Sequence, residues 1–221
     1  MRFLKRLVIS SALLAGMGIA VAWYLLNASL ARLDGNALLD GLAGPVVVER
    51  DESGVTTIRG RNRTDLARAT GYVHGQERFF QMDLSRRQAA GELAALFGPL
   101  ALDADRGFRR HRFRSRAGQV LAAAAEQDRE LLSAYAEGVN AGLADLGARP
   151  WEYLILGNPP EPWRPVDSLL VLYSMFLELI DSNGNRETAF DLLDRTLPGA
   201  MVRFFSPAGT EWDAPMRGPD H

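Results

Sequence analysis

The sequence predicts an α+β protein that is mostly helical and begins with one long apolar helix. Apolar residues recur at helical spacing over most of the 221-residue chain. A single pair of β-branched runs flanks a polar turn near residue 50. The N-terminal stretch contains about twenty residues without a charge, which is the length of a membrane-spanning helix.

The composition is that of an ordinary globular chain, with 47% apolar and 24% charged residues. The formal net charge of −2 excludes a broad basic field, so no nucleic-acid partner is expected. Cysteine is absent, which excludes a small disulfide-stabilised scaffold.

Residues 1–30 are expected to be a signal peptide or a membrane anchor. A basic start is followed by the uncharged run 7–26, and about 20 helical residues span about 30 Å, the thickness of the bilayer hydrocarbon core. Trp23 and Tyr24 stand at the far end, where aromatic rings favour the interface. The length of the run and a poor cleavage site at 27–29 favour the anchor over a cleaved signal. Either way, the rest of the chain is expected in the periplasm.

After a short amphipathic linker at residues 31–44, two strands are expected at 46–49 and 55–58. The polar segment between them contains Gly54, which is typical of a β-hairpin. A two-stranded hairpin is marginally stable alone, so this one is expected to join a larger sheet.

Five helical segments follow. Residues 65–97 are expected to form a helix capped by Thr64 and broken near Gly91, followed by a basic helical stretch at 106–125 and a helix that begins at Asp128. Beyond a proline-rich connection at 151–165, residues 167–180 form a helix that is apolar almost all round and needs a larger partner to bury it. A last helix is expected at 186–196.

No catalytic residue is assigned in this chain. There is no zinc-binding His-Glu-x-x-His motif, no Gly-x-Ser-x-Gly elbow and no phosphate-binding loop. Of the three histidines, His74 lies on a helix and is expected to be structural. The arginine-rich run 109–116 is expected to be a solvated or salt-bridged face rather than a phosphate site.

The segment 71–83 mixes glycines with charges and aromatics. Gly71 and Gly75 each cost a helix about 1 kcal/mol relative to Ala, which indicates that another backbone packs closely there. Arg78, with Glu77 or Asp83, is expected to form a buried ion pair.

Nine ordered pieces of this sequence resemble the α chain of the penicillin acylase family and together cover about residues 45–195. They are residues 48–55, Gly71-Tyr72, 76–82, Arg86-Arg87, 91–94, Phe97-Gly98 with Asp105 and Arg109, 135–141, 162–165 and Asp167-Ser168. The family includes penicillin, cephalosporin and acyl-homoserine-lactone acylases, so the resemblance leaves the acyl substrate open.

The resemblance implies the αββα sandwich of N-terminal-nucleophile hydrolases, made as a precursor that is cut into α and β chains. Residues 45–205 would be the α-chain region, and residues 206–221 the start of a spacer or a truncated end. The nucleophile would be the first residue of a β chain, with its own α-amino group as base. The chain is therefore expected to need that β chain as partner and to be inactive alone as a hydrolase of N-acyl compounds.

Two contributions of this chain to a shared site follow from the resemblance. Phe176, Leu179 and Ile180 would line the acyl pocket, where an apolar wall suits a fatty or otherwise apolar acyl group. Glu187 would give one ligand to a calcium ion shared with the β chain, because a hard cation takes carboxylate oxygens. The alternative for the three apolar residues is core packing against the β chain. The alternative for Glu187 is a solvent-facing carboxylate at the start of a helix. No organic cofactor is expected.

A membrane-anchored helical binding module without catalysis, or an inactive fragment, is the alternative to the hydrolase. The apolar segment 167–180 and the absence of a nucleophile support it.

Overall fold

The computed structural model describes residues 2–179 and 184–205. The chain divides into two compact units, Met1–Met175 and Phe176–His221. Helices dominate both units, and the strands of the described residues form one antiparallel pair in the first. The predicted α+β, mostly helical character is therefore confirmed.

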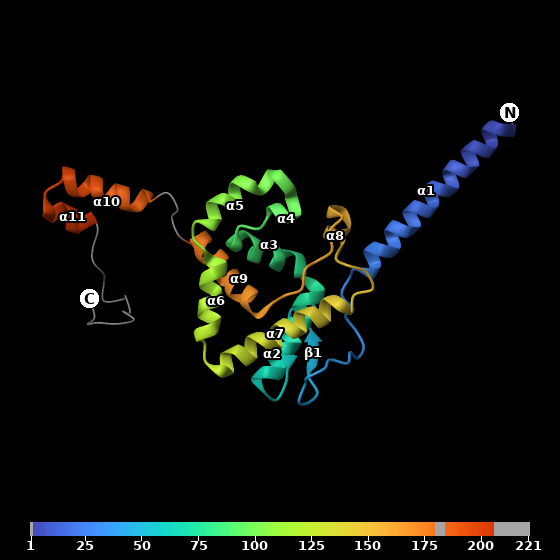
Figure 1. Cartoon of the computed structure of the whole chain (residues 1–221), viewed down its shortest axis with the longest axis horizontal. Coiled ribbons are helices and arrows are strands. Elements are labelled where there is room, and N and C mark those ends of the chain that lie inside the picture. The colour runs from blue at the N-terminus through green and yellow to red at the C-terminus, as the bar shows by residue number, and fades with distance from the viewer. Residues whose placement is uncertain (1, 180–183, 206–221) are drawn as a thin grey trace. The chain divides into compact units, whose positions relative to one another are not determined.

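Helix α1 runs over Arg2–Ala28 and confirms the predicted apolar helix (Figure 1). Its segment Ile9–Ala28 has a mean hydropathy of 1.8 and none of it is buried, unlike a core helix of a soluble domain. By length and composition this helix can cross a membrane. Residues 31–44 then follow without a helix or strand and contact α2, where the Ala43 amide donates to Asp65 Oδ1 at 2.9 Å.

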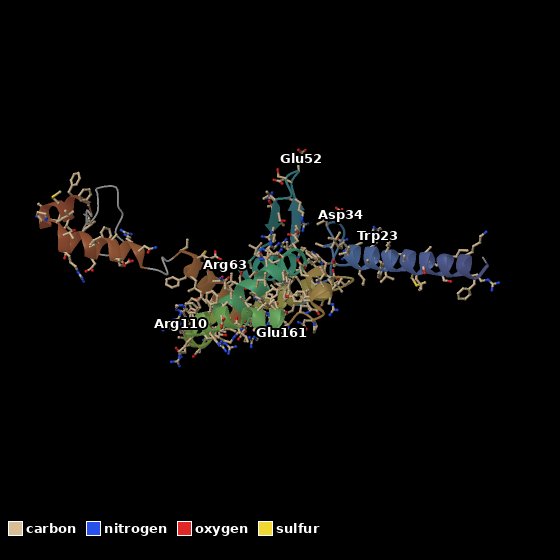
Figure 2. All side chains as sticks on the ribbon, turned by 90° about the horizontal axis from the view of Figure 1, so that it is seen from above. Trp23, Asp34, Glu52, Arg63, Arg110 and Glu161 are labelled. Atoms are coloured by element: carbon tan, nitrogen blue, oxygen red, sulfur yellow. The ribbon has the colours of Figure 1, made fainter. Side chains whose placement is uncertain are left out.

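Strands β1 (Val47–Arg50) and β2 (Thr56–Arg59) form the predicted hairpin, one residue later than expected. Val48 pairs with Ile58 in the antiparallel register. Asp51 closes the turn by accepting the amides of Ser53 and Val55 at 2.9 and 2.8 Å. Glu52 lies at the tip of the hairpin, away from the helices (Figure 2).

The predicted helix over 65–97 is several elements. Helix α2 (Arg63–Glu77) is capped by Asn62, not Thr64, because the Asn62 side chain accepts the Asp65 amide. An irregular residue, Arg78, separates α2 from α3 (Phe79–Ala90), a break the sequence did not predict. The break near Gly91 is confirmed: Gly91 is left-handed with φ of 69° and ends α3.

Short helices fill the next segment: α4 (Ala94–Phe97), the 3₁₀ turn η1 (Gly98–Ala101), α5 (Leu102–Arg109) and α6 (Phe113–Ala123). Arg112, with φ of 56°, separates α5 from α6, so the expected continuous stretch 106–125 is wrong. Helix α7 covers Glu126–Ala144, and α8 (Trp151–Leu156) lies in the segment expected to be only a connection.

Helix α9 (Pro165–Leu179) confirms the apolar helix and crosses the boundary between the two units. In the second unit, α10 (Asn185–Thr196) is close to its predicted bounds, while α11 (Gly199–Phe205) was not predicted. Neither α10 nor α11 has a buried residue.

Helices α2 and α7 lie side by side and form the centre of the first unit (Figure 1). A Cβ added to Gly71 or Gly75 would overlap the backbone of α7, and one added to Gly138 or Gly142 would overlap that of α2. The close packing predicted from the first two glycines is therefore confirmed. The apolar core beside this contact consists of Phe79, Leu96, Ala136, Val139, Tyr153 and Trp163.

Candidate functional site

Five buried polar side chains from α3, α8 and α9 meet in one cluster: Asp83, Arg86, Arg87, Tyr153 and Asp167. We call them the buried charge cluster. Arg78 does pair with Glu77, at 3.8 Å, but the pair is not buried as expected, because the Arg78 side chain is 58% exposed. Asp83 instead pairs with Arg86 and Arg87, one helical turn further along α3.

Arg86 links α3 to the start of α9. It donates to Asp83 Oδ1 at 2.6 Å and to Asp167 Oδ2 at 2.7 Å. Its remaining N–H groups donate to the carbonyls of Glu161 and Pro162, both at 2.9 Å. The guanidinium also lies 5.0 Å from the centroid of the Trp163 ring, a cation–π contact. Arg86 is thus satisfied on every side.

Asp167 pairs with three arginines, Arg86, Arg114 and Arg164, and accepts one backbone amide. Arg114, on α6, donates to its Oδ1 at 3.1 Å and also holds Glu92 at 2.5–2.6 Å. The Arg164 amide donates to Oδ2 at 2.9 Å. Burial by itself raises the pKa of the Asp167 carboxyl, but the charges of Arg86 and Arg164 and the Arg164 amide outweigh it and hold that pKa below its ordinary value.

Tyr153 completes the cluster from α8 by donating to Asp83 Oδ2 at 2.6 Å. Burial, and then the bond to the Asp83 carboxylate, raises the pKa of the Tyr153 phenol. Nearby, Asn140 on α7 makes a reciprocal pair with the backbone of Trp163, at 2.9 and 2.7 Å. All these groups are mutually saturated, so the cluster holds α9 in place and offers no free acid or base to a substrate.

The predicted acyl-pocket residues lie on the second half of α9. Phe176 is 51% exposed and Leu179 is 77% exposed, while Ile180 lies outside the described residues. The same exposed face includes Leu172 and Met175, at 54% and 52%. By contrast, Leu170 is fully buried one or two turns earlier on the same helix. The structure thus places Phe176 and Leu179 on one helix, with apolar side chains that are 51% and 77% exposed.

The predicted calcium ligand Glu187 is an exposed residue in the first turn of α10. In the described parts of the chain, no group of three or more His, Asp or Glu side chains is placed to hold a metal ion. One carboxylate does not make a calcium site, so this chain would need ligands from elsewhere.

The two described histidines contact aromatic residues. His74 Nδ1 lies 2.8 Å from the Tyr135 hydroxyl, and His111 stacks on Phe113 with ring centroids 5.0 Å apart. Burial, and then the neighbouring Arg78 charge, lowers the pKa of His74. Burial raises the pKa of Tyr135 to about 12. Both groups are therefore neutral at pH 7 and contact each other.

Sequence reasoning missed the buried charge cluster. The spacing of Asp83 with Arg86 and Arg87 was a usable signal, because residues three and four apart share a helix face. The arginine-rich run 109–116 contains both salt-bridged and solvated residues. Arg114 pairs with Glu92 and Asp167, whereas Arg110 and Arg112 are exposed. The contact of Arg86 with Asp167, 81 residues later, had no local signal.

The comparisons with known proteins agree with this architecture. The family described as penicillin amidase matches residues 45–212. Penicillin acylase 2 proenzyme of a Pseudomonas strain, SE83, is 40% identical over 147 residues, which cover 66% of this chain and 19% of that protein. The acyl-homoserine lactone acylase QuiP of Pseudomonas fluorescens is 31% identical over 183 residues, covering 82% of this chain and 22% of that protein.

The chain is also similar to a solved structure, a thermostable penicillin G acylase from Alcaligenes faecalis. The TM-score is 0.57 with 27% sequence identity, covering 79% of this chain and 97% of the matched chain. The chain spans about a fifth of the length of the curated relatives named above. With the family matching well over half of its residues, this chain belongs to the penicillin amidase family.

Proposed function

We propose that this chain is the α-chain part of an exported amide hydrolase of the penicillin-acylase type. Together with a β chain of the same precursor, it would cleave the linear amide C–N bond of an N-acyl compound. The N-terminal nucleophile would lie on that β chain, and the two chains together would form the αββα sandwich.

The observation that carries this proposal is a difference in coverage. This chain matches 97% of one chain of the solved penicillin G acylase, but only 19% of the penicillin acylase 2 proenzyme. A segment of this size is therefore a separate polypeptide in a solved relative and a fraction of a proenzyme in another. The exposed apolar face of α9 and the two-stranded sheet are consistent with a missing partner.

The test is to express the gene together with the coding sequence that follows it. We expect amidase activity on N-acyl substrates and a new N-terminal Ser, Thr or Cys after processing. A following sequence without such a residue behind a processing site would contradict the proposal. The chain expressed alone, residues 1–221, is the control and is expected to be inactive.

Within this function, Phe176, Leu179 and Ile180 would line the acyl pocket. The apolar side chains of the first two are uncovered on α9, which suits an apolar acyl group. In the two-chain protein, Leu179→Ser should lower kcat/KM for long-chain acyl substrates roughly tenfold, and for short ones much less. An equal loss for both substrate lengths would count against a pocket role.

Glu187 is the proposed calcium ligand of this chain, with the remaining ligands on the β chain. Its exposure on α10 leaves the carboxylate accessible to a partner. In the two-chain protein, Glu187→Gln should weaken calcium binding measured by calorimetry, whereas the exposed control Asp194→Asn should leave it unchanged. Equal affinities for the wild type and Glu187→Gln would remove Glu187 from the site.

Export would bring the protein to the periplasm, with α1 acting as a signal sequence or as a membrane anchor. The span Ile9–Ala28 supports either role by its length and composition.

A further inference from the structure

The C-terminal end of α1 is built into the first unit. The Ala28 carbonyl accepts the Ala148 amide at 3.0 Å, across the loop after α7. Gly147 comes so close that a Cβ there would stand 3.3 Å from Ala28 Cβ. Ser29 is only 6% exposed, and its hydroxyl donates to the Leu26 carbonyl at 2.8 Å. Helix α1 therefore continues into the folded body without a free linker.

An apolar hollow of about 350 Å³ lies at this junction. It is lined by residues 29–31 and 33, by the end of α2 and the start of α3, and by the start of α8. Leu30, Leu33 and Trp151 line it and remain 63%, 62% and 46% exposed. Ile155, 74% exposed, lies one turn after Trp151 on α8. We call these four side chains the apolar collar.

The end of α1 carries two further exposed aromatics, Trp23 and Tyr24, at 66% and 63%. Figure 2 shows Trp23 near the end of α1 that leads into the body, with Asp34 shortly beyond it. Aromatic rings at the end of a membrane-spanning helix mark the boundary between lipid and water. The apolar collar follows within a few residues, so it lies at that same boundary.

A lipid interface is the partner that this surface fits. A segment of 20 apolar residues with none buried needs an apolar surrounding, and the collar is continuous with its end. Contact with lipid would remove the exposed Trp and Leu side chains of the collar from water, which is favourable for apolar surface. The four collar side chains are apolar, whereas Gln76, Glu77, Gln81 and Glu152 also line the hollow, so apolar and polar groups meet there as they do at the lipid–water boundary.

Cleavage of α1 would damage this junction. Small residues with the spacing of a signal-peptidase site occur at Ser29 and Ala31. A cut after Ala31 would remove Ala28 and Ser29 from the fold and leave the Ala148 amide without its acceptor.

We propose that α1 is retained in the mature protein and that the apolar collar rests on the outer interface of the membrane that α1 crosses. This inference rests on the export proposed above and not on the acylase activity. Lipid contact of the collar would place residues 150–155 and the start of α3 close to the bilayer surface.

Retention is tested on the full-length protein with a C-terminal tag. We expect the intact mass of the membrane-bound protein to include residues 1–31, and the protein to stay with the membrane after a carbonate wash. Protein that starts at Arg32 and is released by the wash would overturn the anchor. A tag protected from protease in spheroplasts would overturn the export as well, so the two failures are distinguishable.

Contact of the collar with lipid is tested by fluorescence in vesicles that contain phosphatidylglycerol and brominated acyl chains. The background variant Trp23→Phe with Trp212→Phe removes the signals of the helix and of the C-terminal tryptophan, and Trp163, which is 2% exposed, is an internal reference. We expect bromine-dependent quenching in this background and its loss when Trp151→Phe is added. Equal quenching with and without Trp151 would overturn the collar contact.

Discussion

The two units differ in how much of their side-chain surface is buried or paired within the same unit. In the first, the α2–α7 contact packs glycines against backbone, and the buried charge cluster pairs arginines with carboxylates. In the described part of the second, no residue of α10 or α11 is buried, and Phe176 and Leu179 are exposed. The contrast is one of internal packing: the first unit has a core fixed by its own residues, whereas the described helices α10 and α11 bury none of theirs.

The largest expected effect is on the α2–α7 contact. Gly138→Val places a side chain into the backbone of α2 at Arg68, which cannot move aside as a flexible side chain would. We expect a loss of about 3–5 kcal/mol in the free energy of unfolding, measured by denaturant titration of the full-length protein. Gly118→Ala is the matched control, because nothing lies within 4 Å of its added Cβ; it should stabilise α6 by about 0.4–1 kcal/mol. A tolerated Gly138→Val would break the contrast between the units.

The next effect concerns the buried charge cluster. Asp167→Asn leaves Arg86 buried without its full counter-charge, and should cost about 3–5 kcal/mol at pH 7. The exposed pair of Asp191 with Arg195 is the control, and Asp191→Asn should change stability by less than about 0.5 kcal/mol. Similar losses for both variants would show that burial does not distinguish the units.

The pH dependence sharpens the same test. The pKa of Asp167 is lowered in the folded protein, so its contribution to stability is fully present above the unfolded value of about 3.9. That contribution is lost as the pH falls below 4 through the folded pKa. Denaturant titrations between pH 5 and pH 2.5 should therefore show a flatter acid limb for Asp167→Asn than for the wild type. Parallel limbs would mean that Asp167 is not ionised in the fold.

The smallest effect compares two leucines on α9. Leu170→Ala empties a fully buried position and should cost about 2–5 kcal/mol. Leu179→Ala, at a position 77% exposed, should change stability by less than about 0.5 kcal/mol in the chain alone. In the two-chain protein, Leu179→Ala is expected to become destabilising if a β chain covers it. An unchanged stability there would show that this surface faces solvent or substrate instead.

The features that the sequence predicted well depend on neighbouring residues. The hairpin follows from β-branched runs around Gly54, and the close helix contact follows from Gly71 and Gly75, since two glycines in a helix need a packing reason. The stop at Gly91 follows from its freedom to adopt positive φ. In each case the sequence pattern that determines the local structure lies within about ten residues.

The incorrect predictions concern features that depend on contacts between residues far apart in the sequence. Arg78 was expected to be buried, but the helix is interrupted at this residue. Asp83 forms its ion pairs with Arg86 and Arg87 instead. Helix α8 was expected to be an irregular connection because prolines surround it, yet the buried Tyr153 needs it to reach Asp83. For the site, the sequence placed Phe176 and Leu179 on the apolar helix correctly. The acyl-pocket role proposed for them would depend on a β chain, and no residue pattern within this chain specifies those contacts.

The link from Arg86 to Asp167 has a consequence for synthesis. The two residues are 81 positions apart, so at about 5–20 residues per second the ribosome adds the second about 4–16 seconds after the first. During that interval the guanidinium has only its local partner Asp83. The buried charge cluster is therefore completed only after the segment that follows Trp163 has been made.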